Sequence, residues 1–138
     1  MNILKKIIFS FIFVSIASVS FAETKMRITL QLPLKAHLGQ NLLVFKKELE
    51  ARSDIKVEIY DSAQLYKDKE VPQAVGSGAI EAGVASITRF AGTNPEVDIF
   101  YLPFLFDSED KIRKATSAGS EIRTILDPAI ANTGAVPL

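Results

Sequence analysis

The chain has 138 residues with as many acidic as basic groups, so its formal net charge is zero. This length suggests one domain, and the balanced charge argues against nucleic acid or an anionic membrane as a partner. The absence of cysteine excludes a disulfide framework, a thiolate zinc site and a cysteine nucleophile. With 48% hydrophobic and 23% charged residues, the composition is that of a folded protein.

The first 22 residues differ from the rest and predict a secretory signal peptide. Lys5 and Lys6 precede a short apolar stretch, and the segment ends in Ser20-Phe21-Ala22. The stretch is shorter than the roughly 20 residues that cross a bilayer, so a membrane anchor is the weaker interpretation. We expect cleavage after Ala22, export to a periplasm, and a mature chain 23–138 with a net charge of −2.

A β–α–β unit is predicted at the start of the mature chain. Apolar and polar residues alternate through 26–32, as in a strand, and again through 54–60. The segment between them carries apolar residues spaced like one face of an amphipathic helix: Leu38, Leu42, Phe45 and Leu49. Because the strands are too far apart for a tight hairpin, a parallel pair with a crossover helix is expected.

The next segment, 61–96, predicts a loop, a helix and a third strand. A polar loop runs to residue 68, and a short helix from about Lys69 to Val75 tolerates Pro72 in its first turn. Residues 79–86 are small and apolar and indicate a buried strand that ends near Ser86, before a turn-rich connection.

The run VDIFYLPFLF, residues 97–106, is predicted to be a buried strand that ends at Pro103, with Phe104 in the core. Two short helices follow, capped by Asp107 or Ser108 and by Ser120, and Pro128 is expected to break or kink the second. The closing residues 134–138 resemble the start of another strand. The order β-α-β-α-β-β-α indicates an α/β domain.

No catalytic or metal-binding constellation is visible in the sequence. His37 is the only histidine, and no serine has the surroundings of an activated nucleophile. Gly76 and Gly78 close a predicted helix instead of opening one, so they do not predict a dinucleotide site. We therefore expect no enzyme activity, no metal and no cofactor.

A ligand site is expected beyond the carboxyl ends of the parallel strands, where α/β sheets bind their ligands. The segments at those ends contain an amide, carboxylates, hydroxyls, an arginine and aromatic rings: 31–33, 60–68 and 86–90. Such a mixture suits a small polar ligand, although each residue taken alone can equally be an ordinary loop residue.

The order of several short motifs resembles the DctP-type solute-binding proteins of tripartite ATP-independent periplasmic (TRAP) transporters. A strand ends at Tyr60 and is followed by Ser62-Ala63-Gln64-Leu65. Gln73 precedes Gly78-Ala79-Ile80-Glu81, which leads into a strand, and Leu102-Pro103-Phe104 comes later. The resemblance covers the mature chain, and Tyr66 departs from it, since glycine usually follows Gln-Leu.

The resemblance implies a periplasmic-binding-protein-like lobe with a mostly parallel sheet flanked by helices. Family members have two lobes and are about twice as long, so residues 23–138 are expected to be the first lobe, incomplete and without the second. The arginine that usually clamps the ligand carboxylate would lie beyond this chain. The missing half would also return a strand to this sheet.

The implied function is capture of a small organic acid, such as a C4-dicarboxylate, and its delivery to the membrane permease of a TRAP transporter. By resemblance, the ligand-binding residues of this lobe are Gln31, Asp68, Ser86, Arg89 and Phe90. A binding protein of an ATP-driven importer or of a sensor is the alternative, and a secreted hydrolase is disfavoured because the chain shows no nucleophile and base. A structural envelope protein, which would bind no ligand, is a further alternative.

Overall fold

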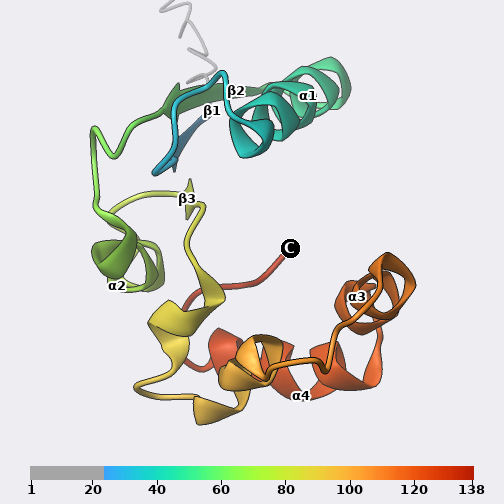
Figure 1. Ribbon diagram of the computed structural model, residues 1–138. Helices are drawn as coiled ribbons and strands as arrows, with labels where there is room; N and C mark the ends of the chain where they lie inside the picture. The colour runs from blue at the N-terminus through green and yellow to red at the C-terminus, as the bar shows by residue number, and fades with distance from the viewer. Residues whose placement is uncertain (1–23) are drawn as a thin grey trace, which may run out of the picture.

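Three parallel strands form the sheet of the computed structural model, which describes residues 24–138 (Figure 1). They are β1 (Thr24–Thr29), β2 (Ile55–Tyr60) and β3 (Ala82–Gly83), in the order β2-β1-β3. Thr24 pairs with Ile55 in β2, and Ile28 pairs with Ala82 in β3. The predicted parallel β–α–β unit is confirmed, and the third strand is shorter than predicted. The predicted signal peptide and its cleavage site lie outside the described residues.

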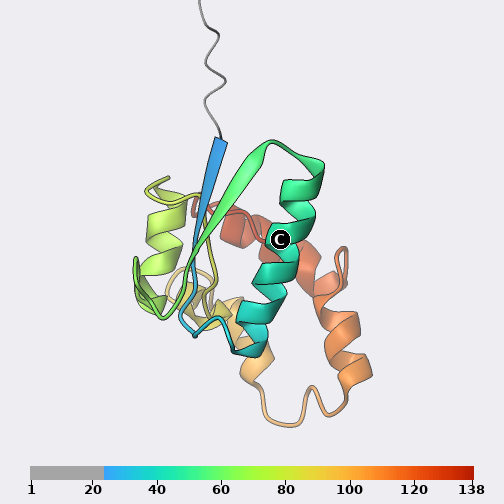
Figure 2. The ribbon, with the colours of Figure 1, turned by 90° about the horizontal axis from the view of Figure 1, so that it is seen from above.

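Helices cover both faces of this sheet. Helix α1 (His37–Arg52) and helix α2 (Val71–Gly76) lie on opposite sides of the strands (Figure 2). As a result β1, the central strand, is buried on both faces at its carboxyl end: Ile28, Thr29 and Leu30 are at most 2% exposed. A central strand of a parallel sheet is expected to be covered in this way.

Side chains of α1 close the outer edge of β2. The backbone N–H of Val57 donates to Glu50 Oε1 at 2.9 Å, and Lys46 Nζ donates to the carbonyl oxygen of Val57. Lys46 and Glu50 also pair with each other at 3.0 Å. Satisfying the unpaired backbone groups of an edge strand removes a site where another strand could add.

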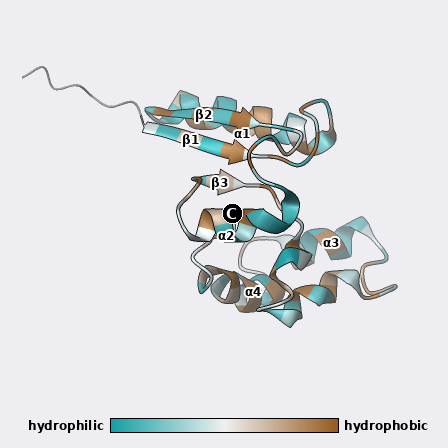
Figure 3. Ribbon diagram, turned by 90° about the vertical axis from the view of Figure 1, so that its left-hand side faces the viewer, coloured by the Kyte–Doolittle hydropathy of each residue, from teal (hydrophilic) through white to brown (hydrophobic). Residues whose placement is uncertain are grey.

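The second half of the described chain forms a helical layer beyond β3 (Figure 3). It contains α3 (Glu109–Thr116) and α4 (Glu121–Ala131). The predicted caps are confirmed, since Ser108 and Ser120 accept hydrogen bonds from the backbone N–H groups of Lys111 and Arg123. Helix α4 continues past Pro128, so the proline does not end it.

The run 97–106 is not a strand. Its first half belongs to a 3-10 helix, η3 (Pro95–Tyr101), and its second half forms a turn. Pro95 suits the first turn of a helix, and residues three apart, such as Val97 and Phe100, share one side of a 3-10 helix. Only Val97 is buried, whereas Phe104 is 93% exposed and has a positive φ of 61°. The predictions of a buried strand and of a core role for Phe104 are therefore wrong.

The end of the described chain packs against α2 without forming the predicted strand. Residues 135–138 have no regular secondary structure. Gly76 and Gly134 allow the two backbones to touch, because a Cβ on Gly76 would lie 2.3 Å from the carbonyl oxygen of Thr133. No helix within residues 24–138 is long and apolar enough to cross a bilayer.

Candidate functional site

The turn that follows β2 holds the carboxyl ends of the strands together. Asp61 accepts hydrogen bonds from the backbone N–H of Leu34 and from Gln64 Nε2, both at 2.9 Å. Ser62 and Ala63 have positive φ angles of 51° and 57° and donate their N–H groups to carbonyls at the end of β1. Non-glycine residues in this conformation are strained and cluster at functional sites, so this edge of the sheet is a candidate ligand site.

Asp68 joins two of the segments that follow the strands. This residue begins the 3-10 helix η1 (Asp68–Glu70), and its Oδ1 accepts the backbone N–H of Ser86 at 3.0 Å. Its Oδ2 accepts a hydrogen bond from Arg89 Nε. Partial burial alone would raise the pKa of Asp68, but these hydrogen bonds and the guanidinium charge outweigh it and lower the pKa. The carboxylate is thus charged and has a partner on each oxygen.

Arg89 keeps its outer edge available. It lies in the 3-10 helix η2 (Ile87–Phe90), and its side chain is about half exposed. Asp68 takes Nε, while neither terminal nitrogen has a hydrogen-bond partner within residues 24–138. These two nitrogens form the fork that binds a carboxylate through two parallel hydrogen bonds. Asp68 therefore orients Arg89 while leaving its anion-binding edge free.

Three hydroxyl groups meet beside this ion pair. Ser86 Oγ lies 2.9 Å from Thr88 Oγ1 and 3.0 Å from the hydroxyl of Tyr101. The sequence analysis identified Ser86 but neither Thr88 nor Tyr101. A lone hydroxyl within the apolar run 97–106 was the only available signal for Tyr101.

Gln31 approaches the same segment from the end of β1. Its Nε2 donates to the carbonyl oxygen of Val84 at 3.3 Å, which fixes the orientation of the amide because a carbonyl can only accept. The other amide atom, Oε1, is buried and has no hydrogen-bond partner among residues 24–138. A buried acceptor without a donor is costly, and such a group marks a place for a missing donor.

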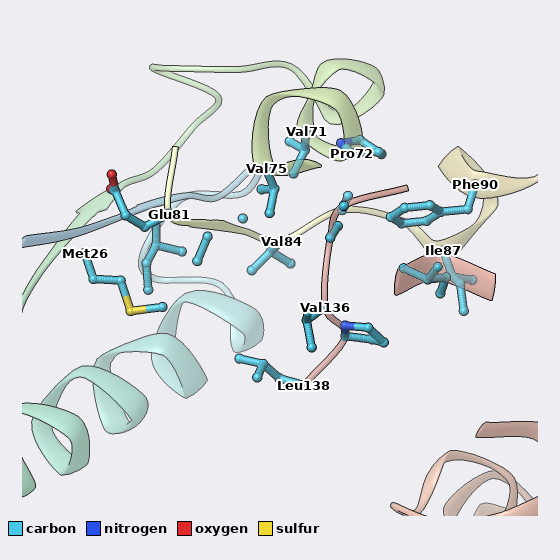
Figure 4. A pocket seen from close by; sticks show the side chains of 18 of the residues that line it. Met26, Val71, Pro72, Val75, Glu81, Val84, Ile87, Phe90, Val136 and Leu138 are labelled. Carbon is cyan, nitrogen blue, oxygen red and sulfur yellow. The ribbon is translucent and has the colours of Figure 1, made fainter. Parts of the chain in front are cut away.

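Phe90 lies apart from the polar groups, on an apolar groove of about 670 Å³ (Figure 4). The groove runs along β3 and is lined by α1, α2 and the last residues of the chain. Val84 and Ile87 line it together with Phe90, while the polar side chains described above do not. The structure thus brings Asp68, Ser86 and Arg89 into contact, places Gln31 beside them through Val84, and puts Phe90 on an adjoining apolar wall.

Metal ligands do not gather at this site. No group of three or more His, Asp or Glu residues that could hold a metal ion occurs between residues 24 and 138. What the arrangement offers to a small polar anion is one guanidinium edge and several hydroxyls that can donate hydrogen bonds.

The chain is similar to known proteins both in sequence and in structure. The family model of bacterial extracellular solute-binding protein, family 7 (DctP) matches residues 31–138. A solute-binding protein of Verminephrobacter eiseniae is 31% identical over 110 residues, which are 77% of this chain and 33% of that protein.

Two solved structures share the fold. An extracytoplasmic solute receptor of Bordetella pertussis that binds pyroglutamic acid is 27% identical, with a TM-score of 0.69 over 80% of this chain and 36% of that one. A TRAP periplasmic solute-binding protein of Sulfurospirillum deleyianum with bound succinate is 26% identical, with a TM-score of 0.70 over 82% of this chain and 36% of that one.

The chain spans about a third of the length of these relatives, and it corresponds to one lobe of their fold. The relatives are solute-binding receptors and not enzymes. Because the family model covers most of the residues, the chain belongs to the bacterial extracellular solute-binding proteins of family 7, the DctP-type binding proteins of TRAP transporters.

Proposed function

We propose that residues 23–138 are the first lobe of a two-lobed periplasmic receptor that captures a small organic acid and delivers it to a TRAP membrane permease. The receptor performs no chemistry on its ligand. Binding is capture between two lobes that close about a hinge, which is a common way for such receptors to enclose a ligand.

The observation that carries this proposal is the free edge of Arg89. Neither of its terminal nitrogens has a hydrogen-bond partner within residues 24–138, and together they match the geometry of a carboxylate. A hydrogen bond to a charged group contributes about 1.5–3 kcal/mol, whereas a millimolar complex already corresponds to about 4 kcal/mol, so Arg89 supplies part of the binding free energy and the rest must come from the complete site. Asp68 keeps the guanidinium in place, Ser86 offers a hydrogen bond to a ligand oxygen, Gln31 borders the site through Val84, and Phe90 supplies an apolar wall.

The relatives support the ligand class. The two solved structures described above hold pyroglutamic acid and succinate, which are both small carboxylic acids. The matched part of this chain covers only 36% of each of those chains, so the complete site and the second lobe are part of the proposal.

The test uses the protein expressed from its complete reading frame. A thermal-shift screen with small mono- and dicarboxylates identifies a ligand, and calorimetry then compares the parent with Arg89→Gln. We expect at least a tenfold loss of affinity, because the substitution removes the charge and the bidentate fork. Arg113→Gln, which removes an exposed arginine paired with Glu109 on α3, is the matched control and should bind like the parent. Failure of every acid to stabilise the protein, or equal affinities for the parent and Arg89→Gln, would contradict the proposal.

Export to the periplasm is part of the same proposal. The mature protein recovered from the periplasmic fraction should begin at Glu23, the residue that directly follows the predicted cleavage site. An intact mass that includes residues 1–22 would refute cleavage after Ala22.

A further inference from the structure

The loop that follows η3 exposes an unbroken apolar run. All five residues from Tyr101 to Leu105, here called the apolar loop, are exposed, and Phe104 is 93% exposed. No charged residue occurs between Asp98 and Asp107, which flank this run. An apolar centre with a polar rim is typical of protein interfaces. Folded proteins seldom expose several consecutive apolar residues unless the surface has a function.

The apolar loop is held in a defined shape. The rings of Phe100 and Phe106 stack at its base, with their centroids 5.5 Å apart. Within the loop, the backbone N–H of Leu105 donates to the carbonyl oxygen of Leu102 at 3.4 Å. The positive φ of Phe104, 61°, is unfavourable for a bulky residue. The fold therefore presents the ring of Phe104 to the outside at a cost in free energy.

The apolar loop lies beside the ligand site. Figure 2, where the loop is pale orange, and Figure 3 both show it projecting past the carboxyl ends of β1 and β2, in the direction in which these strands run. Its first residue, Tyr101, has its hydroxyl 3.0 Å from Ser86 Oγ, so the loop begins at the site itself. A surface in this place meets whatever closes over a bound ligand.

The partner that fits this position is the second lobe of the proposed receptor. The lobe described here corresponds to only 36% of the two solved relatives, so most of each of those chains lies outside it. Under the proposed function the ligand is captured between two lobes, and the second lobe approaches from beyond the strand ends. A second copy of the protein or a membrane partner would instead need a surface that stays uncovered when the lobes close.

We infer that the apolar loop is a docking surface for the second lobe and that Phe104 stabilises the closed, ligand-bound state. The inference rests on the proposed function. When the lobes close, the ring of Phe104 leaves water, and the favourable free energy of this burial is gained only in the closed state. A contact made only in the state that binds the ligand adds to the affinity for that ligand.

Phe104→Asn tests the inference without adding backbone strain. Asparagine tolerates a positive φ better than phenylalanine, so the substitution removes the ring and keeps the conformation of the loop. Calorimetry on the protein from the complete reading frame uses succinate, L-malate and pyroglutamate, together with any other acid that the thermal-shift screen identifies. We expect at least a tenfold loss of affinity for each acid that binds the parent, since burying a phenylalanine side chain contributes at least that factor. Without an acid, the melting temperature should be unchanged or slightly raised.

Two further variants separate docking from general damage. Phe104→Leu keeps an apolar side chain in the same place, so its affinity should stay within threefold of the parent. Val44→Asn replaces an exposed apolar residue of α1 and should bind like the parent. Hydrogen exchange reports on the contact directly: the backbone amides of the apolar loop should exchange more slowly in the parent when the acid is saturating, and this protection should be weaker in Phe104→Asn.

The possible failures are distinguishable. Equal affinities of the parent and Phe104→Asn would overturn the inference and leave the organic-acid function standing. A dimer of the parent that Phe104→Asn dissociates without loss of affinity, measured by sedimentation, would assign the apolar loop to a second copy and overturn the inference in the same way. Failure of every acid in the screen to bind the parent would overturn both proposals.

Discussion

Arg27 and Glu81 form the most extensive ion pair of the described chain, at the amino-terminal side of the sheet. Arg27 Nη2 lies 2.7 Å from Glu81 Oε1, and Nε and the backbone N–H of Arg27 both donate to Oε2, at 2.9 and 2.8 Å. The same Nη2 donates to the carbonyl oxygen of Ala79. These hydrogen bonds from the side chain and backbone of Arg27 lower the pKa of Glu81 from its ordinary 4.5 to about 2. The pair ties β1 to the residue just before β3.

This pair should make stability depend on pH in acid. A carboxyl whose folded pKa is lowered adds stability that is complete above pH 4.5 and is lost as the pH falls through about 2. In Glu81→Gln, the urea midpoint should be lower than in the parent at pH 7, and the difference should shrink between pH 4.5 and pH 2. The effect is modest, because both side chains are more than a third exposed.

The control for this prediction is Glu96→Gln. Glu96 has no ion-pair partner within residues 24–138, so its substitution should leave the midpoint unchanged at every pH. A difference between parent and Glu81→Gln that stays constant from pH 7 to pH 2 would count against the role of the charge.

At the scale of elements, the packing of α2 against the end of α4 decides where the last residues lie. The two backbones meet at Gly76 and Gly134, and Gly134 has a positive φ of 89°. This contact directs residues 135–138 along the groove beside β3 (Figure 4). No periodic pattern marks such a meeting point, because it involves residues almost 60 positions apart.

Gly76→Ala tests this contact. The new Cβ would lie 2.3 Å from the carbonyl oxygen of Thr133, so α2 and α4 must separate. We expect a loss of about 1–3 kcal/mol in the free energy of unfolding, the usual cost of overpacking, measured by urea denaturation.

Gly92→Ala is the matched control, since a Cβ there meets nothing within 4 Å and the residue has a negative φ. It should be neutral or slightly stabilising, because alanine reduces the freedom of the unfolded chain. Equal effects of the two substitutions would show that the close backbone approach does not limit stability.

At the scale of the whole molecule, the two edges of the sheet differ: side chains cover the backbone groups at the β2 edge, and the β3 edge is open. Lys46 and Glu50 satisfy the outer backbone groups of β2, whereas β3 is an edge strand beside the apolar groove. Several large apolar residues are exposed in the second half of the described chain, including Leu102, Phe104, Val136 and Leu138. Unpaired edges and exposed apolar patches of this kind favour association with other chains.

We therefore expect residues 23–138, expressed alone, to be marginally stable. The isolated polypeptide should bind the dye ANS, melt broadly and aggregate at micromolar concentration, because its groove is open to solvent. It should also show no measurable affinity for carboxylates. The protein from the complete reading frame is the control and should show weak dye binding. A sharp, cooperative melt of the isolated, monomeric polypeptide would refute the prediction.

Local patterns predicted most of the first half of the fold. Alternation gave β1 and β2, the apolar spacing from Leu38 to Leu49 gave α1, and the serines before α3 and α4 gave their starts. These signals act over a few residues, so they can be interpreted without knowing which segments pack against them. The family resemblance was carried by short motifs of the same kind.

Patterns failed where neighbours in space decide the outcome. The run 97–106 is apolar enough for a strand, yet it has no neighbouring strand within the described chain and turns instead into a 3-10 helix with Phe104 exposed. Burial of an apolar run depends on what covers it, and this information lies elsewhere in the sequence.

The same distinction between local patterns and tertiary contacts applies to the candidate site. The sequence by itself determined the α/β class, the family and the side chains at the strand ends, because each of these depends on the local order and spacing of residues. Only the tertiary structure decided that Asp68 holds Arg89 by one nitrogen, that Gln31 keeps an unpaired oxygen and that Tyr101 joins Ser86. These contacts join segments 15 or more residues apart, and their geometry follows from how the strands and turns pack.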